Sequence, residues 1–364
     1  MISHRNICVL CHSDSKLLTI KSIKSPYHFI DNSKEEEYDL TYGYCENCFS
    51  VQLMTLLNPE ILYDGYKNIL PFSANYNWIQ HNISFIQFVV SCINTNQPII
   101  EIGSSSFLLG KHLIEFYKDY TVFDISLKTC EKKKDVKYIE GNCENYQFEN
   151  ESNILMSHVF EHLYEPKKFI ENCFKNSVKN IIISIPNMNS NNVFHITNQH
   201  TFLYNDTDIE YIFSLYNYKC TKKIFFNTND ESFPCMFFNF SFVVSGVLNI
   251  ERTTTTKIPI YHSISNFLNN TIKISKNTFI ATAVMFSSIL FNLIIEKDNI
   301  IGVIDQNIDL HGKTFSNTNL LIYSYEHLKS FDESTNIIVC HQRKNDIINC
   351  IRKVNNKITI IVIE

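Results

Sequence analysis

The spacing of apolar residues along the chain predicts alternating helices and strands. Residues 78–93 carry an apolar residue at every third or fourth position, which is typical of a helix with one buried face. Short β-rich runs then alternate with helical stretches at 108–117 and 166–174. The predicted strands are PIIEIG, YTVFDI, VKYIEG, NILMSH and NIIISIP. This alternation predicts a parallel sheet covered by helices on both faces.

The pattern changes after a further helix predicted at 206–215. Two apolar strands, 222–227 and 236–246, follow with no helix between them, so we expect an antiparallel hairpin that closes the sheet. The segment NIERTTTTKIP at 249–259 interrupts the apolar pattern and marks a domain boundary.

A second α/β unit is predicted after this boundary. Its segments are a strand at 278–282, a helix, the strands IIGVID and LLIYS, a helix after Ser324, the strand NIIVCH, a helix at 346–354, and the strand ITIIVI. The expected domains are therefore a cysteine-rich lobe at 1–75, an α/β domain at 76–250 and a second α/β domain at 258–364. Residues 278–295 carry no charge and just reach the length of a membrane span, but we predict a buried strand, turn and helix there.

Composition narrows the class of protein further. The chain has 364 residues, of which 45% are hydrophobic and 19% charged, as expected for a globular protein of two or three domains. Its net charge of -5 argues against nucleic-acid binding that depends on the overall charge of the protein. The first residues show no secretory signal pattern, so we expect a cytoplasmic protein with no membrane partner.

Four of the twelve cysteines form two CxxC pairs, Cys8 with Cys11 and Cys45 with Cys48. Two such pairs can place four thiolates around one tetrahedral zinc ion, in a closed structural site. Free buried thiols, or one redox-active pair, are the alternatives, and His12 and His28 are possible substitute ligands. The remaining eight are expected to be small buried hydrophobes: Cys92, Cys130, Cys143, Cys173, Cys220, Cys235, Cys340 and Cys350.

The run IIEIGSSSFLLG at 99–110 is the first sign of a cofactor site. A strand that ends in an acidic residue and leads through a tight turn into a helix is typical of class I methyltransferases, which bind S-adenosylmethionine there. Glu101 would lie near the amino-acid part of the cofactor, with the backbone of Gly103 close to it. Asp124 follows the next strand and can accept hydrogen bonds from both ribose hydroxyls. Asn142 follows the third strand, where an adenine-facing residue is expected.

Four further segments resemble one family, the zinc-containing sugar C-methyltransferases that act on nucleotide-activated keto-deoxysugars. They are CENCFSVQL at 45–53, SHVFEHLYEP at 157–166, NQHTFLYNDTDIEYIF at 198–213 and VIDQNIDLHGK at 303–313. The resemblance implies a zinc lobe, a Rossmann-like domain that binds S-adenosylmethionine, and a C-terminal Rossmann-like α/β domain that binds the sugar nucleotide.

The resemblance also implies catalytic residues. His200 would remove a proton next to a ketone, and the resulting enolate would attack the methyl group of the cofactor. His162 would orient or protonate the keto oxygen, although it could equally be a capping or packing histidine. Gln199 stands in place of the family's glutamate, and Tyr76 or Tyr66 matches a family tyrosine.

Other positions depart from the family pattern. Ser105 and Phe107 replace a small residue and a glycine after Gly103, so we expect the Phe107 side chain to narrow the cofactor cleft. Thr197 replaces a tyrosine, and the glycine turn of the C-terminal domain falls at 280–287, which contains no glycine. Two alternatives therefore stay open beside C-methylation: a sugar O-methyltransferase, and a catalytically silent binding or scaffold protein.

Overall fold

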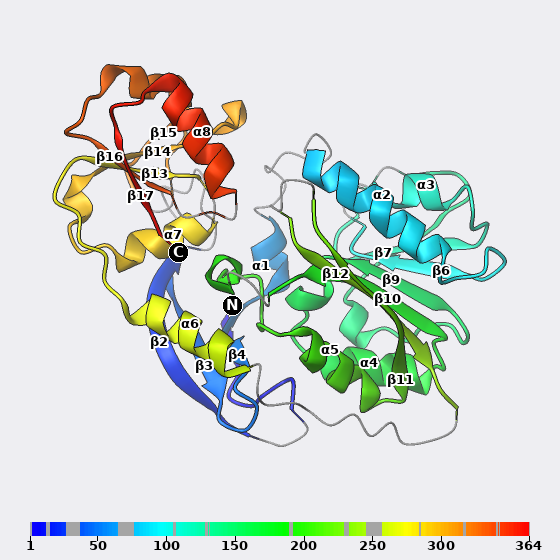
Figure 1. Ribbon diagram of the computed structural model, residues 1–364. Coiled ribbons are helices and arrows are strands. Elements are labelled where there is room, and N and C mark those ends of the chain that lie inside the picture. Colours follow the sequence, from blue (N-terminus) through cyan, green and yellow to red (C-terminus); the bar gives the residue numbers. More distant parts are fainter. Residues whose placement is uncertain are drawn as a thin grey trace.

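The computed structural model shows three β-sheet regions in chain order, which Figure 1 colours from blue to red. It describes residues 2–363 with the exception of 12–14, 27–36, 65–75, 105–106, 128–129, 131, 189–191, 229–232, 245–256, 284, 316–317, 340 and 342.

The N-terminal lobe consists of two small antiparallel sheets. One contains β2 (Leu17–Pro26), β3 (Glu37–Cys45) and β4 (Val51–Leu53). The other pairs β1 (Ile2–His4) with β5 (Thr55–Leu57), and the short helix α1 (Pro59–Asp64) follows. Both CxxC pairs lie in this lobe, as the sequence predicted.

A seven-stranded sheet forms the middle of the molecule. Its strands are β6 (Ile99–Ile102), β7 (Tyr120–Asp124), β8 (Lys137–Glu140), β9 (Asn153–Ser157), β10 (Asn180–Pro186), β11 (Tyr218–Phe226) and β12 (Cys235–Phe242). They lie in the order β11-β12-β10-β9-β6-β7-β8. The first five strands are parallel, while β12 runs antiparallel between β10 and β11. This is the class I methyltransferase arrangement, and the predicted parallel strands and closing hairpin are confirmed.

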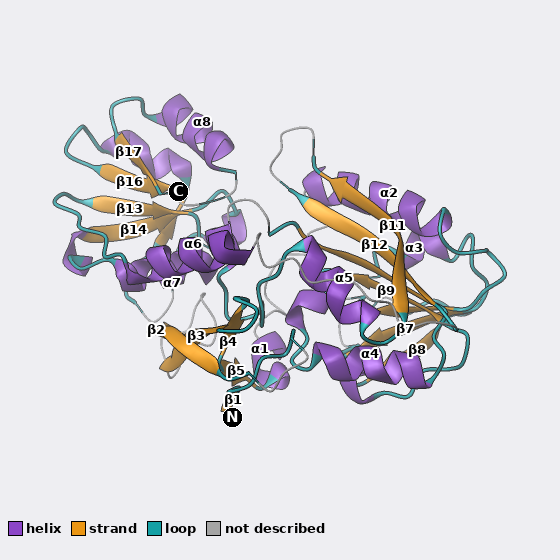
Figure 2. Cartoon of the chain, turned by 60° about the horizontal axis from the view of Figure 1, so that its bottom comes forward, coloured by secondary structure: helices purple, strands orange, loops and turns teal. Residues whose placement is uncertain are grey.

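Helices cover both faces of this sheet, as expected (Figure 2). The helix α2 (Tyr76–Val90) and the short α3 (Gly110–Leu113) pack on one face, whose core includes Phe85 and Val122. The helices α4 (Pro166–Lys175) and α5 (Asp206–Ser214) pack on the other.

The predicted helix at 108–117 is shorter than expected. Only four of its residues are α-helical, and turns flank them on both sides. The amide of Phe116 bonds to the carbonyl oxygen of Leu113, a three-residue step that tightens the chain and ends the helix.

The C-terminal region is a five-stranded parallel sheet with its own helices. In chain order its elements are α6 (Lys257–Asn269), β13 (Thr278–Ala281), α7 (Met285–Leu293), β14 (Ile300–Ile304), β15 (Ile322–Tyr323), β16 (Asn336–Val339), α8 (Lys344–Val354) and β17 (Thr359–Val362). The strand order β15-β14-β13-β16-β17 is Rossmann-like, as predicted. The helix expected after Ser324 is a 3-10 segment, Tyr325–Ser330.

The uncharged run at 278–295 forms β13 and α7, which confirms the expected buried strand and helix, while the turn expected between them falls partly outside the described residues. Among the described residues, no helix has both the length and the apolar composition that crossing a membrane requires. Most of the boundary segment predicted at 249–259 lies outside the described residues, and α6 begins within its last positions.

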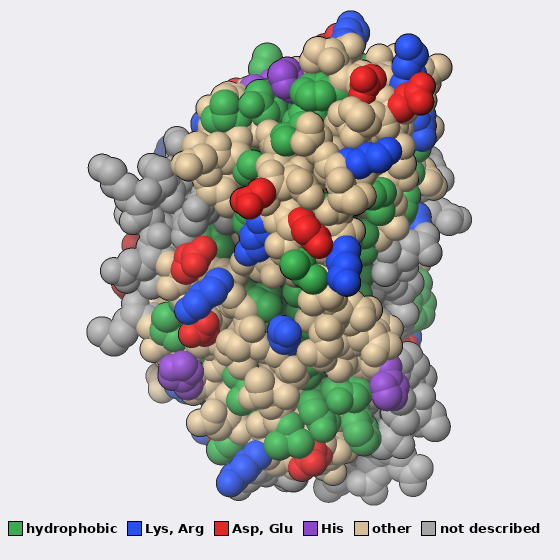
Figure 3. Space-filling model, turned by 90° about the vertical axis from the view of Figure 1, so that its left-hand side faces the viewer, with side chains coloured by type: hydrophobic (Ala, Val, Ile, Leu, Met, Phe, Trp, Pro, Cys, Tyr) green, Lys and Arg blue, Asp and Glu red, His purple; other side chains and the backbone are tan. Residues whose placement is uncertain are grey.

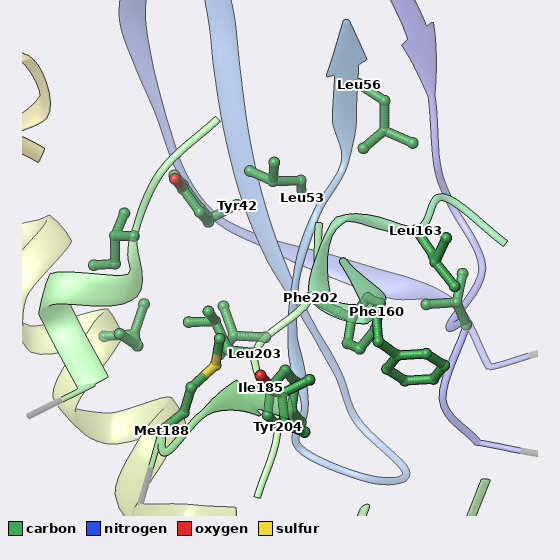
Figure 4. Packing of buried hydrophobic residues seen from close by; sticks show 14 of the residues in the cluster. Tyr42, Leu53, Leu56, Phe160, Leu163, Ile185, Met188, Phe202, Leu203 and Tyr204 are labelled. Carbon is green, nitrogen blue, oxygen red and sulfur yellow. The ribbon is translucent and has the colours of Figure 1, made fainter. Parts of the chain in front are cut away.

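The N-terminal lobe packs directly on the middle domain. The amide of Leu53 bonds to the carbonyl oxygen of Thr201 at 3.0 Å, and the amide of Leu203 bonds to that of Val51 at 2.8 Å. Figure 4 shows the resulting core, in which Phe202 and Leu203 lie beside residues of the lobe. The segment that follows His200 is therefore held by the lobe as well as by its own domain.

Candidate functional site

The loop after β6 requires glycine at position 103. Gly103 has a φ of +73°, and a Cβ atom there would lie 2.3 Å from Cγ2 of Val159. The loop therefore packs directly against the segment after β9. Glu101 is buried beneath the loop, and its carboxylate accepts a hydrogen bond from the hydroxyl of Tyr120 at 2.8 Å. Burial raises the pKa of Glu101 to about 7.

The other predicted cofactor residues lie along the same edge of the sheet. Because β6, β7 and β8 are parallel neighbours, Asp124 and Asn142 follow adjacent strand ends. Asp124 accepts a hydrogen bond from the amide of Ser126 at 3.0 Å. Asn142 caps a short 3-10 turn through the amide of Glu144 at 2.8 Å. Ser105 lies outside the described residues.

Phe107 does not narrow a cofactor cleft, which corrects the sequence-based expectation. Its φ of +58° turns the side chain inward, where it has no exposed surface and belongs to the core with Tyr120. Gly110 provides the space, because a Cβ atom there would lie 2.1 Å from the ring of Phe107. A ring without exposed surface lines no open cleft.

His162 and His200 lie together beside the carboxyl ends of the strands, with ring centroids 5.1 Å apart. Nδ1 of His162 lies 3.2 Å from the backbone oxygen of Gln199, and Nδ1 of His200 lies 3.0 Å from that of His195. A carbonyl oxygen only accepts, so each Nδ1 carries the proton and each Nε2 has a free lone pair when the ring is neutral. Thr197 fixes the turn by accepting from the amide of His200 at 3.1 Å.

Both rings are held neutral. Burial lowers the pKa of His200 well below its ordinary value, and the charges of His162 and His195 lower it further. Burial also lowers the pKa of His162, and the nearby carboxylate of Glu161 only partly offsets this. The pair can therefore accept protons near neutral pH without first losing one.

Glu161 is a third member of this site that the sequence analysis did not single out. It is completely buried, and neither carboxylate oxygen has a hydrogen-bond partner. Oε1 of Glu161 lies 4.0 Å from Nε2 of His162. One possible ligand atom from each of three side chains lies within 4.8 Å of the other two: Glu161, His162 and His200. We call these three residues the histidine centre. The sequence signal that could have pointed to Glu161 is its position three residues after His158, a spacing that brings the two side chains close together.

Two tyrosines expected at the site are not placed by the structure. Tyr76 is the first residue of α2, but its side chain lies outside the described part of the chain. Tyr66 lies outside it entirely. Gln199 is nearly buried, and its backbone oxygen provides the bond to His162.

The four paired cysteines converge as predicted. Their sulfur atoms all lie within 4.8 Å of one another, and the Cys8–Cys48 and Cys11–Cys45 separations are both 3.6 Å. A tetrahedral zinc ion with zinc–sulfur bonds of about 2.3 Å requires separations of roughly 3.7 Å. All four side chains are buried and none forms a disulfide bond. His12 and His28 lie outside the described residues.

Hydrogen bonds complete the surroundings of the cysteine site. The amides of Leu10 and Cys11 point at the sulfur of Cys8, each at 3.4 Å, and Gln52 approaches it at 2.9 Å. Lys167 on α4 donates to the backbone oxygen of Cys11 at 2.9 Å. A bound cation would favour the thiolate form of all four cysteines.

The C-terminal domain has a second candidate site at its topological switch point, where the strand order reverses between β13 and β16. Asp305, after β14, accepts from the amides of Ala283 at 2.9 Å and Asn307 at 2.8 Å, and so fixes two of the loops there. The hydroxyl groups of Thr282 and Ser287 are buried without a hydrogen-bond partner.

Solved structures with similar folds include methyltransferases. Magnesium protoporphyrin IX methyltransferase from Synechocystis PCC 6803, with bound SAM, is 12% identical, and the match covers 51% of this chain and 98% of that chain with a TM-score of 0.39. N-methyltransferase NodS from Bradyrhizobium japonicum WM9 is 13% identical, with 46% and 97% covered and a TM-score of 0.37. The sequence matches no protein-family model and no curated protein. The strand order of the chain itself defines its class I methyltransferase fold.

Proposed function

We propose that this protein is an S-adenosylmethionine-dependent methyltransferase. The contact between Gly103 and Val159 is the observation that carries the proposal, because it joins the loop expected to hold the cofactor to the segment that carries Glu161 and His162. A methyl donor bound over Gly103, with its ribose on Asp124 and its adenine near Asn142, would then lie beside two neutral histidines. Methyl transfer requires this proximity of donor and acceptor.

The proposed substrate is a sugar linked to a nucleotide. The resemblance in sequence supports this choice, and so does the switch point of the C-terminal sheet, where Asp305 holds two loops at the carboxyl ends of the strands. Acidic and basic side chains are interspersed on the face drawn in Figure 3, which offers no extended basic surface there for a nucleic acid.

C-methylation beside a keto group is the first proposed reaction. Nε2 of His200 accepts the proton from the carbon next to the ketone, and the carbanion equivalent attacks the methyl group of the sulfonium. S-adenosylmethionine, when bound, would supply the methyl group, and its sulfur would keep the electron pair of the broken carbon–sulfur bond. His162 would have to carry a proton on Nε2 to donate to the keto oxygen, because its Nδ1 faces the backbone oxygen of Gln199.

O-methylation is a second candidate, and the histidine centre favours it in one respect. Glu161, His162 and His200 all present acceptor atoms. A sugar hydroxyl can donate to such atoms, whereas a ketone oxygen can only accept. His200 would then remove the hydroxyl proton, and no carbon-bound proton would leave.

We also propose that Cys8, Cys11, Cys45 and Cys48 hold one structural zinc ion. The sulfur separations fit a tetrahedral site, and all four positions around the ion are filled by protein. Zinc would thus stabilise the lobe that contacts the segment around His200, and would take no part in the reaction.

Titration calorimetry of the full chain with S-adenosylmethionine tests the proposed function. Saturable binding, together with transfer of a labelled methyl group to a nucleotide-linked sugar, is the expected result. Absence of binding would favour the scaffold alternative. Deuterium on the carbon beside the ketone separates the two reactions, because only C-methylation removes it.

A further inference from the structure

A second group of metal-ligand side chains lies apart from the four cysteines. His81 comes from α2, His158 follows β9, and Cys235 begins β12. One ring nitrogen of each histidine and the sulfur of Cys235 lie within 4.8 Å of one another. His81 and Cys235 are buried, and the side chain of His158 is 15% exposed. We call these residues the His–His–Cys cluster.

Oxygen atoms at the far side of each ring orient both histidines toward the cluster. Oδ1 of Asn82 lies 3.1 Å from Nδ1 of His81, and Oε1 of Glu161 lies 3.3 Å from Nδ1 of His158. Nδ1 of His81 therefore carries the proton, and its Nε2 accepts a hydrogen bond from the hydroxyl of Ser184 at 2.6 Å. The approach of Glu161 to Nδ1 of His158 is a close contact without hydrogen-bond geometry, because Oε1 has no hydrogen-bond partner. A carboxylate or carbonyl oxygen behind the ring is the usual companion of a metal-bound histidine. The cluster also provides a role for Glu161, whose carboxylate is buried without a hydrogen bond.

The spacing fits a shared zinc ion. The sulfur of Cys235 lies 3.6 Å from Nε2 of His158. Zinc bonds of about 2.3 Å to sulfur and about 2.05 Å to nitrogen, at a tetrahedral angle, place these two ligand atoms roughly 3.6 Å apart. The four-cysteine site of the same molecule shows the same degree of agreement.

Aromatic rings enclose the cluster. Trp78 lies 4.9 Å from the ring of His158, Phe233 lies 5.6 Å from it, and Phe237 lies 5.4 Å from the ring of His81, measured between centroids. An apolar shell of this kind limits water and strengthens the attraction between a cation and its ligands. The hydroxyl of Ser184 donates to Nε2 of His81 at 2.6 Å, and this hydrogen bond must break when a zinc ion takes the same lone pair.

We propose that Nε2 of His81, Nε2 of His158 and Sγ of Cys235 bind a second zinc ion. Cys235 binds as the thiolate, and its proton passes to solvent when the ion enters. Because the three ligands come from a helix and two strands that are distant in sequence, the ion joins α2 to the ends of β9 and β12. The proposal does not depend on methyl transfer, since no residue of the cluster belongs to the proposed reaction.

Metal analysis of the full chain, purified under reducing conditions and saturated with zinc, tests the proposal. We expect two zinc ions per chain. X-ray absorption should show sulfur ligands at about 2.3 Å and, in addition, nitrogen or oxygen ligands at about 2.0–2.1 Å. One zinc ion per chain with sulfur ligands alone would overturn the proposal, and this measurement requires no variant.

Variants assign the second ion to its ligands. His81→Gln and Cys235→Ser should each reduce the zinc content from two to one, while Cys220→Ser, a partly exposed cysteine outside both sites, should leave it at two. If either ligand variant fails to fold, the X-ray absorption spectrum of the wild-type protein still shows whether a second zinc ion with nitrogen ligands is bound. Retention of two ions in a folded Cys235→Ser variant would contradict the assignment. Binding of S-adenosylmethionine is measured separately, so failure of one proposal is distinguishable from failure of the other.

Discussion

Arg5 donates a hydrogen bond from its guanidinium group to the backbone oxygen of Thr201 at 2.7 Å, and Thr201 directly follows His200. The same guanidinium group donates to the backbone oxygen of Tyr164 at 2.6 Å. Although burial lowers the pKa of Arg5 to about 10, the group stays charged at neutral pH. One side chain of the N-terminal lobe thus connects the two segments that carry the histidine centre.

Arg5→Met should reduce turnover more than it reduces binding of S-adenosylmethionine. The substitution removes the Arg5 donor from the backbone oxygen of Tyr164 and leaves that of Thr201 with the amide of Leu53 alone. The unpaired oxygen costs about 1–3 kcal/mol, and the segment of His200 is held less firmly. The ratio of the change in kcat to the change in cofactor affinity is the measurement. Arg352→Met, on the exposed side of α8, is the matched control and should behave like the wild type. Equal turnover in both variants would show that the lobe does not position the histidines.

Cys45→Ser should remove the zinc ion of the four-cysteine site and destabilise the N-terminal lobe. Structural zinc sites contribute on the order of 10–16 kcal/mol of apparent binding energy in isolated peptides, so the loss of a ligand is expected to unfold the lobe. Zinc content and thermal melting report the result, with Cys220→Ser as the control. An unchanged melting temperature in Cys45→Ser would exclude a structural zinc there.

Asp124→Ala should weaken the binding of S-adenosylmethionine by about 1–3 kcal/mol, because the ribose hydroxyls lose a charged acceptor. Asp119→Ala removes an exposed carboxylate at the opposite end of the same strand and is the matched control. Calorimetry compares the two affinities. Identical affinities for both variants would show that the ribose does not bind to Asp124.

His200→Asn should leave the fold and the cofactor affinity intact while reducing turnover by roughly 10²–10⁴, the usual contribution of general acid–base catalysis. Because burial lowers the pKa of His200 well below 6.5, the wild-type enzyme should keep its activity as the pH falls through 6.5, where an ordinary histidine would become protonated. His112→Asn, an exposed histidine on α3, is the control. A pH profile that falls with a midpoint near 6.5 would indicate a solvated base elsewhere.

Phe107→Gly should destabilise the protein and leave the binding of S-adenosylmethionine unimproved. Removing the buried ring creates a cavity, and loss of a phenylalanine side chain costs about 3–5 kcal/mol. Phe107→Ala is the matched variant and should be less stable still, by about 1 kcal/mol, because glycine alone adopts the positive φ without strain. Tighter cofactor binding in Phe107→Gly would restore the view that the ring obstructs the cleft.

The sequence by itself determined the order and type of most elements and the convergence of the four cysteines. Apolar runs such as those at 180–186 form strands because every residue is buried, and a parallel sheet then brings Glu101, Asp124 and Asn142 to one edge. The CxxC spacing acts in the same local way, since each pair lies within one tight turn. Local pattern was sufficient to identify the strands and the two CxxC turns, and the regular geometry of a parallel sheet and of a four-cysteine metal site then predicts which of them meet.

Tertiary structure decided which distant side chains meet and which way each one points. The inward turn of Phe107 depends on the space above Gly110, and Glu161 and His162 meet His200 only because the segment after β9 packs against the segment around Gln199. Cys235 looked like an ordinary buried cysteine until α2 and β9 placed two histidines beside it. The contacts within the histidine centre and the His–His–Cys cluster join residues roughly 40 to 150 positions apart in the chain. They arise from the packing of whole elements, which no local period of the sequence encodes.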